Sequence, residues 1–333
     1  MQKKIRRQKE IVFFYNCKTD FSFILRMATE ALVYARIREI YRHPTKLFPT
    51  QQPQSLERSN MDAVFNSKNY VVSQKSDGHQ VALLFTKIDR LGPVCCLFDR
   101  RERLFFYEVF CPVDLFDNTL IIGEKIDDLF LAFDVVSYCG RSLLHENYRT
   151  RLESSNFFSE RVETGEIDFR SPKIQYRTKP VYSLDDFINS FVSVSADDGL
   201  IFMQVEQPLT RTLPLKWKQQ HTVDLLVEAT RSASAPFQYI ILQPPGIGDG
   251  IRLDTESALL KTVEDLATGS SICKFKVVVE CLVSLNGVAR FIPVKFRHDK
   301  IGANLAATVL STIKCVEENI TLDEIIERFH RCK

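Results

Sequence analysis

Residues 68–85, KNYVVSQKSDGHQVALLF, contain two apolar runs separated by the tetrapeptide KSDG at 75–78. Apolar runs on either side of a Ser-Asp-Gly sequence are typical of two β-strands with a tight turn between them. The turn places Lys75 at the end of the first strand, where its side chain is held at the edge of a cleft. A Lys-x-Asp-Gly sequence alone is a weak signal, because a lysine beside a turn is usually exposed to solvent.

The chain outside this stretch combines short strands with helical segments, so we predict an α+β fold with mostly antiparallel sheets. Residues 1–60 are expected to form an N-terminal appendage, because a polar stretch with several prolines follows a helical segment there. Residues 229–236, ATRSASAP, predict a linker between a main domain at 61–230 and a C-terminal domain at 231–333. In the C-terminal domain, short strands followed by helices favour a small barrel, with the OB fold as the leading candidate. Helices are expected at 20–42, 144–168, 303–318 and 322–331.

Composition is that of an ordinary folded protein: of 333 residues, 45% are hydrophobic and 26% are charged. The net charge of +2 does not by itself indicate a nucleic-acid-binding protein, so positive charge would have to be local. The first nine residues hold five Lys or Arg, which indicates either a solvated tail or a weak nucleic-acid or nuclear-import patch.

The pattern of cysteines and the length of the apolar runs indicate the cellular compartment of the protein. Nine Cys without a C-x-x-C pair favour reduced thiols inside the cell, in the nucleus or the cytoplasm, over a disulfide framework. The six His do not cluster with the Cys, which argues against a zinc site. No apolar run reaches the ~18 residues that a membrane span needs, so no membrane association is expected.

Later segments place charged side chains at the ends of apolar strands. Glu124 ends one apolar run, and Asp198 begins another. Lys216 and Lys218 lie two residues apart, so on a strand they share a face. In chain order after KSDG, the segments are TLIIGE at 119–124, FLAFD at 130–134, DGLIF at 198–202, LKWK at 215–218 and RHDK at 297–300.

In this order and with these gaps, the segments closely resemble the motifs of the covalent nucleotidyltransferase superfamily of DNA ligases, RNA ligases and mRNA capping enzymes. Two details resemble capping enzymes in particular. LKWK is followed by TVD at 222–224, and residues 291–304, FIPVKFRHDKIGAN, are similar to the family's R-x-D-K motif. Arg100 in an Asp-Arg pair and the segment YRTKP at 176–180 also match that family. The resemblance spans residues 68–304.

The resemblance implies an mRNA guanylyltransferase, with a nucleotidyltransferase domain at 61–230 and an OB-fold domain after it. Lys75 would attack the α-phosphate of GTP, release pyrophosphate, and carry GMP as a lysyl phosphoramidate. The GMP would then pass to the 5′-diphosphate end of RNA. An amine attacks only when it is neutral, whereas a free lysine has a pKa of about 10.4. Nearby cations such as Mg²⁺ or a second lysine lower that pKa.

The resemblance also implies roles for the other charged residues. Lys216 and Lys218 would neutralise the charge that builds up on the α-phosphate. Glu124 and Asp198 would act in catalysis and hold Mg²⁺ or Mn²⁺, since Mg²⁺ binds through one or two carboxylates plus phosphate oxygens. The residues expected to contact the nucleotide are Asp77, Gly78, Arg100, Phe133, Lys179, Arg297, Asp299 and Lys300.

Several assignments have a structural alternative. Phe133 could stack on guanine or belong to the core, in which case Phe130 could be the stacking ring. Asp134 and Lys179 are as consistent with a structural role as with a functional one. Asp224 could orient the lysines of LKWK or cap a strand.

Three positions depart from the capping-enzyme pattern: Gln80 replaces an arginine, Ile122 an aspartate and Ala303 a proline. Gln80 leaves open a non-catalytic homologue that binds RNA or associates with a polymerase. Because the covalent step is shared with ligases, an ATP-dependent polynucleotide ligase is a further alternative.

Other capping activities are expected on other chains. An RNA triphosphatase and a cap methyltransferase do not fit beside the two predicted domains, and RNA polymerase is a further candidate partner. Residues 1–60 would serve as a strap or a partner-docking segment. The compact and divergent sequence suggests a viral-type member, for which the virion is another possible location.

Overall fold

A computed structural model of the chain shows two compact units. The first unit comprises residues 1–54, 68–196 and 200–215, and the second comprises 55–67, 197–199 and 216–333. The structure describes residues 9–11, 20–42, 48, 52–67, 69–89, 91–190, 199–231, 238–242, 251–255, 257, 259–260, 273–286, 288–298, 300 and 302–331. The three-part division at residues 60 and 230 remains a prediction.

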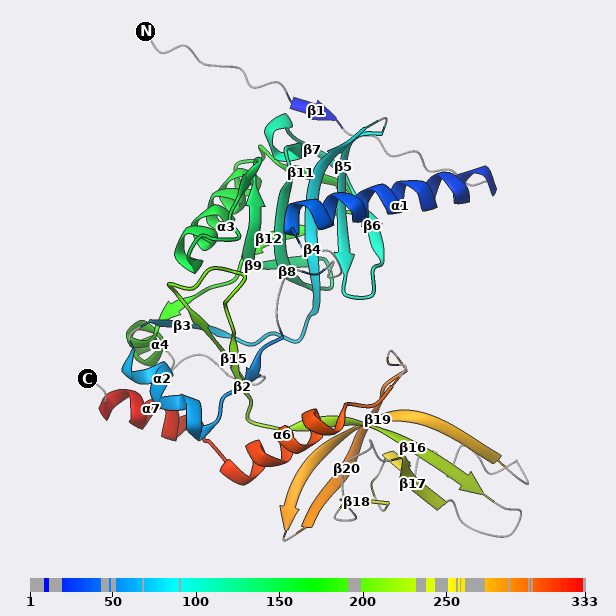
Figure 1. Cartoon of the computed structure of the whole chain (residues 1–333), viewed down its shortest axis with the longest axis vertical. Helices are drawn as coiled ribbons and strands as arrows, with labels where there is room; N and C mark the ends of the chain where they lie inside the picture. Colours follow the sequence, from blue (N-terminus) through cyan, green and yellow to red (C-terminus); the bar gives the residue numbers. More distant parts are fainter. Residues whose placement is uncertain are drawn as a thin grey trace. The chain divides into compact units, whose positions relative to one another are not determined.

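The centre of the first unit is a seven-stranded sheet (Figure 1). Its strands are β4 His79–Ile88, β5 Gly92–Asp99, β6 Leu104–Phe106, β8 Thr119–Ile126, β9 Leu129–Tyr138, β10 Arg141–Ser142 and β12 Gln175–Thr178. The antiparallel order is β10-β9-β8-β4-β5-β6, and β12 joins β9 in parallel. β8 and β9 form the predicted hairpin, with Asp127 in the left-handed conformation at its turn (φ +49°).

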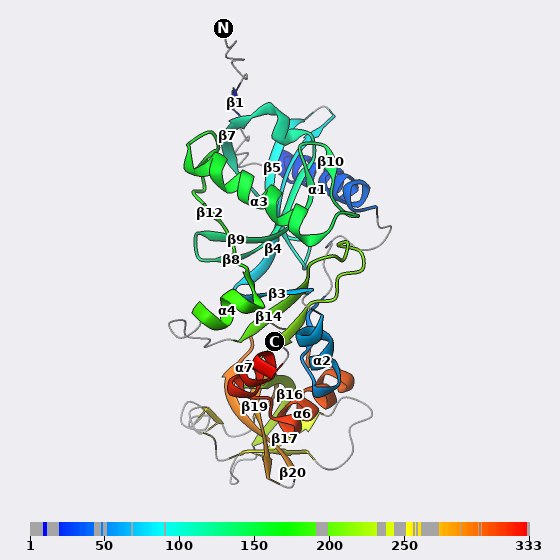
Figure 2. The same cartoon turned by 90° about the vertical axis from the view of Figure 1, so that its left-hand side faces the viewer.

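Helices cover both faces of this sheet: α1, Asp20–Tyr41, and α3, Tyr148–Glu163 (Figure 2). Successive side chains of a strand point to opposite faces, so β4 contributes to two separate clusters. Leu83 packs in the cluster that includes Phe158 of α3, whereas Leu84 packs in the cluster that includes Val33 of α1. The unbroken apolar run VALLF therefore reflects a strand that is buried on both sides, and the helices predicted at 20–42 and 144–168 are confirmed.

Two smaller sheets complete the strands of the first unit that the structure describes, and the chain passes into the second unit after residue 54 and again after residue 215. One has the order β1-β7-β11, with β1 Lys9–Ile11, β7 Glu108–Pro112 and β11 Asp168–Ser171. The other has the order β13-β3-β14-β15-β2, with β2 Gln54–Ser55, β3 Tyr70–Gln74, β13 Tyr182–Ser183, β14 Leu200–Gln204 and β15 Leu215–Trp217. A short 3₁₀ helix at Val113–Phe116 and α4 at Leu184–Ser190 lie between strands. The strand predicted directly before Lys75 is confirmed as β3.

The second unit contains a five-stranded sheet of the order β17-β16-β19-β20-β18. Its strands are β16 Thr222–Arg231, β17 Gln238–Leu242, β18 Ile251–Leu253, β19 Cys273–Asn286 and β20 Val288–Phe296, and its helices include α2 Arg58–Asn66, α6 Ala306–Glu318 and α7 Leu322–Arg331. Alternate residues Val223, Leu225 and Val227 of β16 pack with Phe291 of β20 and Val309 of α6. The predicted strands and C-terminal helices are confirmed, and an OB fold for this unit remains a prediction.

Two segments differ from what the sequence predicts. α1 belongs to the first unit, where the buried residues Val33 and Ile37, one turn apart, pack with Leu84 of the sheet. The sequence predicts that residues 1–60 form an appendage outside the main domain, whereas α1 contributes to the core of the first unit. The predicted linker at 229–236 is wrong in its first part, because β16 continues to Arg231 and pairs there with β19. The rest of that linker lies outside the described residues.

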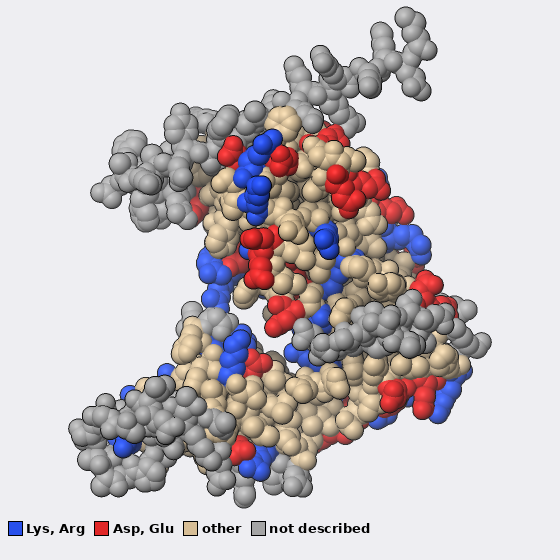
Figure 3. Space-filling model, turned by 180° about the vertical axis from the view of Figure 1, so that it is seen from behind, with Lys and Arg blue, Asp and Glu red and all other residues tan. Residues whose placement is uncertain are grey.

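The surface carries both signs of charge. Figure 3 shows Lys and Arg interspersed with Asp and Glu on one face of the molecule, as the net charge of +2 implies. Within the described part of the chain, no helix has both the length and the apolar character that crossing a membrane requires.

A buried ion pair joins β9 to α3. Both carboxylate oxygens of Asp134 accept hydrogen bonds from Arg151, at 2.6 Å from Nε and 3.0 Å from Nη2. The Arg151 side chain is 0% exposed, and its Nη1 also donates to the carbonyl oxygens of Glu146 and Gln207. Of the two roles open to Asp134 from the sequence, these contacts support the structural one.

Arg151→Ala should lower the free energy of unfolding by about 3–5 kcal/mol, because it leaves Asp134 as a buried charge without its partner. The matched control is Arg141→Ala, which removes an arginine from an exposed ion pair with Glu146 and should cost less than about 1 kcal/mol. Urea unfolding measures both values. Equal losses in the two variants would contradict a structural role for the buried pair.

Candidate active site

Lys75 lies in the loop between β3 and β4, and its side chain is half-buried. Its Nζ lies 3.4 Å from the carbonyl oxygen of Ser76. Gly78 lets this loop lie against β8, because a Cβ added there would be 2.8 Å from Ile126 Cγ1 and 3.0 Å from Glu124 Cβ. The glycine is therefore required by close packing, and it holds the loop of Lys75 against the strand of Glu124.

Ser76, Glu124 and Lys179 form a hydrogen-bonded cluster beside this loop. Lys179 Nζ donates to the Ser76 hydroxyl at 2.7 Å and to Glu124 Oε2 at 3.2 Å. The Ser76 hydroxyl in turn donates to the same carboxylate oxygen. Ser76 was not predicted as a site residue, because it occupies the variable position of the Lys-x-Asp-Gly motif. Asp77, which was predicted to contact the nucleotide, is exposed.

Lys179 is only 6% exposed, and burial lowers the pKa of its amine below the usual value. The Glu124 carboxylate opposes this shift, while the charge of Lys75 adds to it. Lys75 and Lys179 are therefore close enough to interact electrostatically, so two cationic side chains lie in the same small region. Such a region is suited to an anionic ligand.

A pocket of the first unit opens beside the cluster. Its cavity volume of about 110 Å³ is several times the ~10–15 Å³ that one water needs. Polar lining comes from Gln80, Glu124 and Lys179, and the aromatic ring of Phe133 lines it as well. The pocket therefore combines an aromatic surface with hydrogen-bonding groups, as ligand sites commonly do.

Phe133 and Phe130, three residues apart on β9, have different surroundings. Phe133 is half-buried at the pocket, and its carbonyl oxygen accepts a hydrogen bond of 3.0 Å from the Tyr148 hydroxyl. Burial raises the pKa of Tyr148 well above its usual value, so the hydroxyl stays protonated as a donor. Phe130 is 0% exposed and stacks on Tyr176, with ring centroids 5.6 Å apart. The alternative that Phe130 is the stacking ring is therefore wrong.

Gln80 of β4 forms a pair with Arg100, the residue that directly follows β5. Arg100 Nε donates to Gln80 Oε1 at 2.7 Å, and the guanidinium carbon lies 4.9 Å from the ring centroid of Phe48. Gln80 also lies opposite Glu124 in the β4–β8 register and lines the pocket. The amide of Gln80, which replaces an arginine of the capping-enzyme pattern, thus holds the guanidinium of Arg100 by a hydrogen bond.

In the second unit, the LKWK segment shows the alternation that a strand requires. Lys216 and Lys218 are half-buried, whereas Trp217 between them is 4% exposed. Gly199 lies against this strand in a positive-φ conformation (+110°), and a Cβ added there would be 2.0 Å from the Trp217 carbonyl oxygen. Asp198, the predicted catalytic carboxylate directly before it, lies outside the described residues.

The cations of the RHDK segment are paired with carboxylates of the same unit. Arg297 Nη1 lies 3.1 Å from Asp224 Oδ1 and 3.2 Å from Glu280 Oε2, and Lys300 Nζ pairs with the other oxygen of Asp224. Asp224 therefore holds the two cations of this segment, which differs from both roles predicted for it. Asp299 lies outside the described residues.

The residues described do not by themselves make a metal site. Glu124 is the described member of the predicted carboxylate pair, and one of its oxygens already accepts from Ser76 and Lys179. Among the residues that the structure describes, no three His, Cys, Asp or Glu side chains gather as a metal site would require. Binding of Mg²⁺ or Mn²⁺ therefore remains a prediction.

Transfer of a nucleotide through a protein requires a nucleophile beside a pocket, together with cations for the phosphates. The loop of Lys75 lies beside a pocket, and both units carry cations, an arrangement that suits the class of nucleotidyltransferases. Over residues 23–220, more than half of its length, the chain matches the family described as mRNA capping enzyme, catalytic domain. The chain belongs to this family.

Named relatives agree with this assignment. The mRNA-capping enzyme subunit alpha of Schizosaccharomyces pombe is 24% identical over 344 residues, covering 88% of this chain and 82% of that protein. Its namesake from Saccharomyces cerevisiae is 29% identical over 228 residues, covering 54% of this chain and 48% of that protein. A structure of a Lig E DNA ligase covers 74% of this chain and 100% of that chain at 15% identity, but its TM-score of 0.32 does not establish a shared fold. Family membership confirms the predicted mRNA guanylyltransferase.

Ser76→Ala should slow formation of the covalent enzyme–nucleotide intermediate by about tenfold to a hundredfold. The substitution removes a hydroxyl that is hydrogen-bonded to two charged groups, and such a bond contributes ~1.5–3 kcal/mol. Ser76→Thr keeps the hydroxyl and should retain most of the rate. The measurement is a time course of covalent labelling by GTP that carries label in its α-phosphate, with thermal melting to confirm folding. A wild-type rate in Ser76→Ala would show that the cluster does not organise the site.

Gly199→Ala should abolish the intermediate and lower the melting temperature, because the added methyl group would collide with the carbonyl oxygen of Trp217. Gly165→Ala is the matched control: its φ is also positive (+71°), but nothing lies within 4 Å of the added Cβ. This control should lose only the ~1–2 kcal/mol cost of a left-handed residue. Thermal melting and covalent labelling compare the two, and an active, stable Gly199→Ala would contradict the close approach.

Proposed function

We propose that the chain transfers GMP from GTP to the 5′-diphosphate end of RNA through a covalent lysyl–GMP at Lys75. In the first step the neutral amine, having lost its proton to solvent, attacks the α-phosphorus of GTP. The N–P bond forms as the bond to the bridging β-phosphate oxygen breaks, and pyrophosphate leaves. In the second step the terminal phosphate oxygen of RNA attacks the same phosphorus. The N–P bond breaks, Lys75 takes up a proton, and the product is a GpppN end.

The observation that carries this proposal is the setting of Lys75 beside Lys179 and a pocket. Glu124 and Lys179 line that pocket and bond to Ser76, the residue next to Lys75. The ammonium of Lys179 places positive charge beside Lys75, where it would stabilise the negative charge that builds up on the α-phosphate during attack.

The pocket suits the nucleoside part of GTP. We assign stacking on the base to Phe133, because its half-buried ring lines the pocket and aromatic rings stack on planar ligands. The paired side chains of Gln80 and Arg100, together with Glu124, are assigned to the ribose hydroxyls. The choice of guanine over adenine is supported by the family to which the chain belongs.

We assign the triphosphate to the cations of the second unit. Lys216 and Lys218 would neutralise the α-phosphate, and Arg297 and Lys300 would take the outer phosphates in exchange for the Asp224 carboxylate that they contact now. Asp299 would act with this pair. Glu124 and Asp198 would hold Mg²⁺ or Mn²⁺, which supplies further positive charge when bound.

The partners follow from the reaction. Its acceptor, a 5′-diphosphate RNA, must come from an RNA triphosphatase, and its product must pass to a cap methyltransferase; we place both activities on other chains. The relatives are named as alpha subunits, which supports an assembly of subunits. Association with RNA polymerase and a nuclear or cytoplasmic location belong to the same proposal.

Lys75→Ala should abolish covalent labelling by GTP that carries label in its α-phosphate, because the missing amine forms the N–P bond. Lys87→Ala is the control, since it removes an exposed lysine of the same unit that pairs with Asp117 at 3.2 Å, and it should be labelled at the wild-type rate.

Two results would contradict the proposal. Label from ATP and not from GTP would indicate an ATP-dependent polynucleotide ligase. No label from either nucleotide, with RNA affinity that weakens as salt rises, would indicate a non-catalytic RNA-binding homologue.

A further inference from the structure

Trp217 anchors β15 to the C-terminal helices of the second unit. It points away from the strand face of Lys216 and Lys218, because side chains alternate along a strand. Its side chain is 4% exposed, and the indole N–H donates to the carbonyl oxygen of Ile320 at 2.8 Å. A buried indole N–H requires such a partner, so this hydrogen bond fixes the orientation of the ring.

The acceptor lies in the short link between α6 and α7. Asn319 ends α6 in the left-handed conformation (φ 45°, ψ 50°). The N–H of Glu324, in the first turn of α7, donates to the Thr321 hydroxyl at 3.1 Å. Ile320 therefore lies between the end of α6 and the start of α7, outside both helices. Its carbonyl oxygen can accept a hydrogen bond from another element there.

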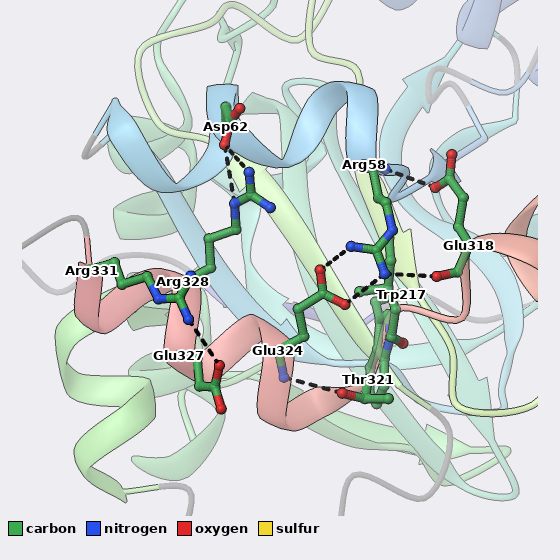
Figure 4. A network of polar contacts seen from close by, with 10 residues as sticks. Arg58, Asp62, Trp217, Glu318, Thr321, Glu324, Glu327, Arg328 and Arg331 are labelled. Atoms are coloured by element: carbon green, nitrogen blue, oxygen red, sulfur yellow. Dashed lines mark hydrogen bonds and ion pairs between the residues drawn. The ribbon is translucent and has the colours of Figure 1, made fainter.

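Arg58, the first residue of α2, holds both helices at this link (Figure 4). Its guanidinium donates to both carboxylate oxygens of Glu324 in α7 and, at 2.9 Å, to the carbonyl oxygen of Glu318 at the end of α6. The backbone N–H of Arg58 donates to the Glu318 carboxylate at 2.8 Å. Just before α2, the N–H of Leu56 donates to the carbonyl oxygen of Lys216 at 2.8 Å. The α2 segment thus binds the helix link on one side and β15 on the other.

A second arginine extends the contact between α2 and α7. Arg328 Nε and Nη2 both donate to Asp62 Oδ1, at 3.1 and 2.8 Å (Figure 4). The neighbouring pair of Arg331 and Glu327 lies within α7, and its side chains are 79% and 67% exposed. This last pair has no part in holding β15 and provides a control on the same helix.

We propose that Arg58 and Trp217 are positioning residues for the lysines of the LKWK segment. Each lysine ammonium sits on a flexible four-carbon stem, so its reach to a phosphate depends on a fixed backbone. The helix link and the α2 segment hold that backbone from two directions, through Ile320 and Leu56. The inference rests on the proposed function of Lys216 and Lys218, and it adds the C-terminal helices to the parts of the chain that GMP transfer requires.

The single tryptophan of the chain makes the anchor directly measurable. Arg58→Ala should shift the fluorescence emission of Trp217 to longer wavelength and increase its quenching by acrylamide, because the indole gains contact with water. It should also lower the maximal rate of labelling by GTP about tenfold to a hundredfold, as a shift of ~1 Å in a positioned group does. The GTP concentration for half-maximal rate should change less, since the lost interaction acts in the transition state. Arg331→Ala should change neither readout.

Trp217→Phe tests the hydrogen bond separately, because it keeps an aromatic ring and removes the N–H donor. It should slow labelling about tenfold, because the lysines of the LKWK segment lose part of their positioning, while thermal melting shows a folded chain. This variant also keeps the test decisive if Arg58→Ala fails to fold.

The outcomes separate this inference from the proposed function. A wild-type labelling rate in Trp217→Phe, or in Arg58→Ala with an exposed indole, would overturn the positioning role while the wild-type chain is still labelled at Lys75. Absence of label on the wild-type chain would contradict the proposed function itself, and the positioning role with it.

Discussion

The carboxylate of Glu124 is the contact on which the site of the first unit depends. It accepts hydrogen bonds from Ser76 and Lys179, and so joins β8 to the loop of Lys75 and to the segment after β12. An ammonium buried as deeply as that of Lys179 is tolerated only with a partner of opposite charge. Without Glu124, the site would hold a nearly buried cation beside Lys75, and the loop would lose the hydrogen bond of Ser76 to the sheet.

The second unit restrains its cations by other means. Asp224 holds Arg297 and Lys300 through ion pairs, whereas the lysines of LKWK are restrained through their backbone by Trp217 and the α2 segment. The two units therefore restrain their cations through different contacts: the first through one partly buried carboxylate, and the second through ion pairs and backbone hydrogen bonds.

The sequence left some site residues ambiguous for a physical reason. Phe130 and Phe133 are equally apolar, and an odd spacing on β9 directs them to opposite faces. Because both faces of the sheet are covered, hydrophobicity cannot show which face meets the pocket. Gln80 is similar: the sequence shows only that it replaces an arginine of the family pattern, whereas the pairing of β4 with β5 brings Arg100 to its amide. Pairing between strands, which no local pattern encodes, decided this point.

The sequence by itself determined the elements around Lys75, the β8–β9 hairpin, the long helices and the order of motifs that identifies the family. These depend on the period of apolar residues and on turn residues close in the chain. Only the tertiary structure decided the packing of α1, the part of Ser76 in the site and the anchor of β15. Those contacts join distant segments, as Arg58 and Glu324 do across 266 positions. Their geometry arises only when the strands and helices pack together.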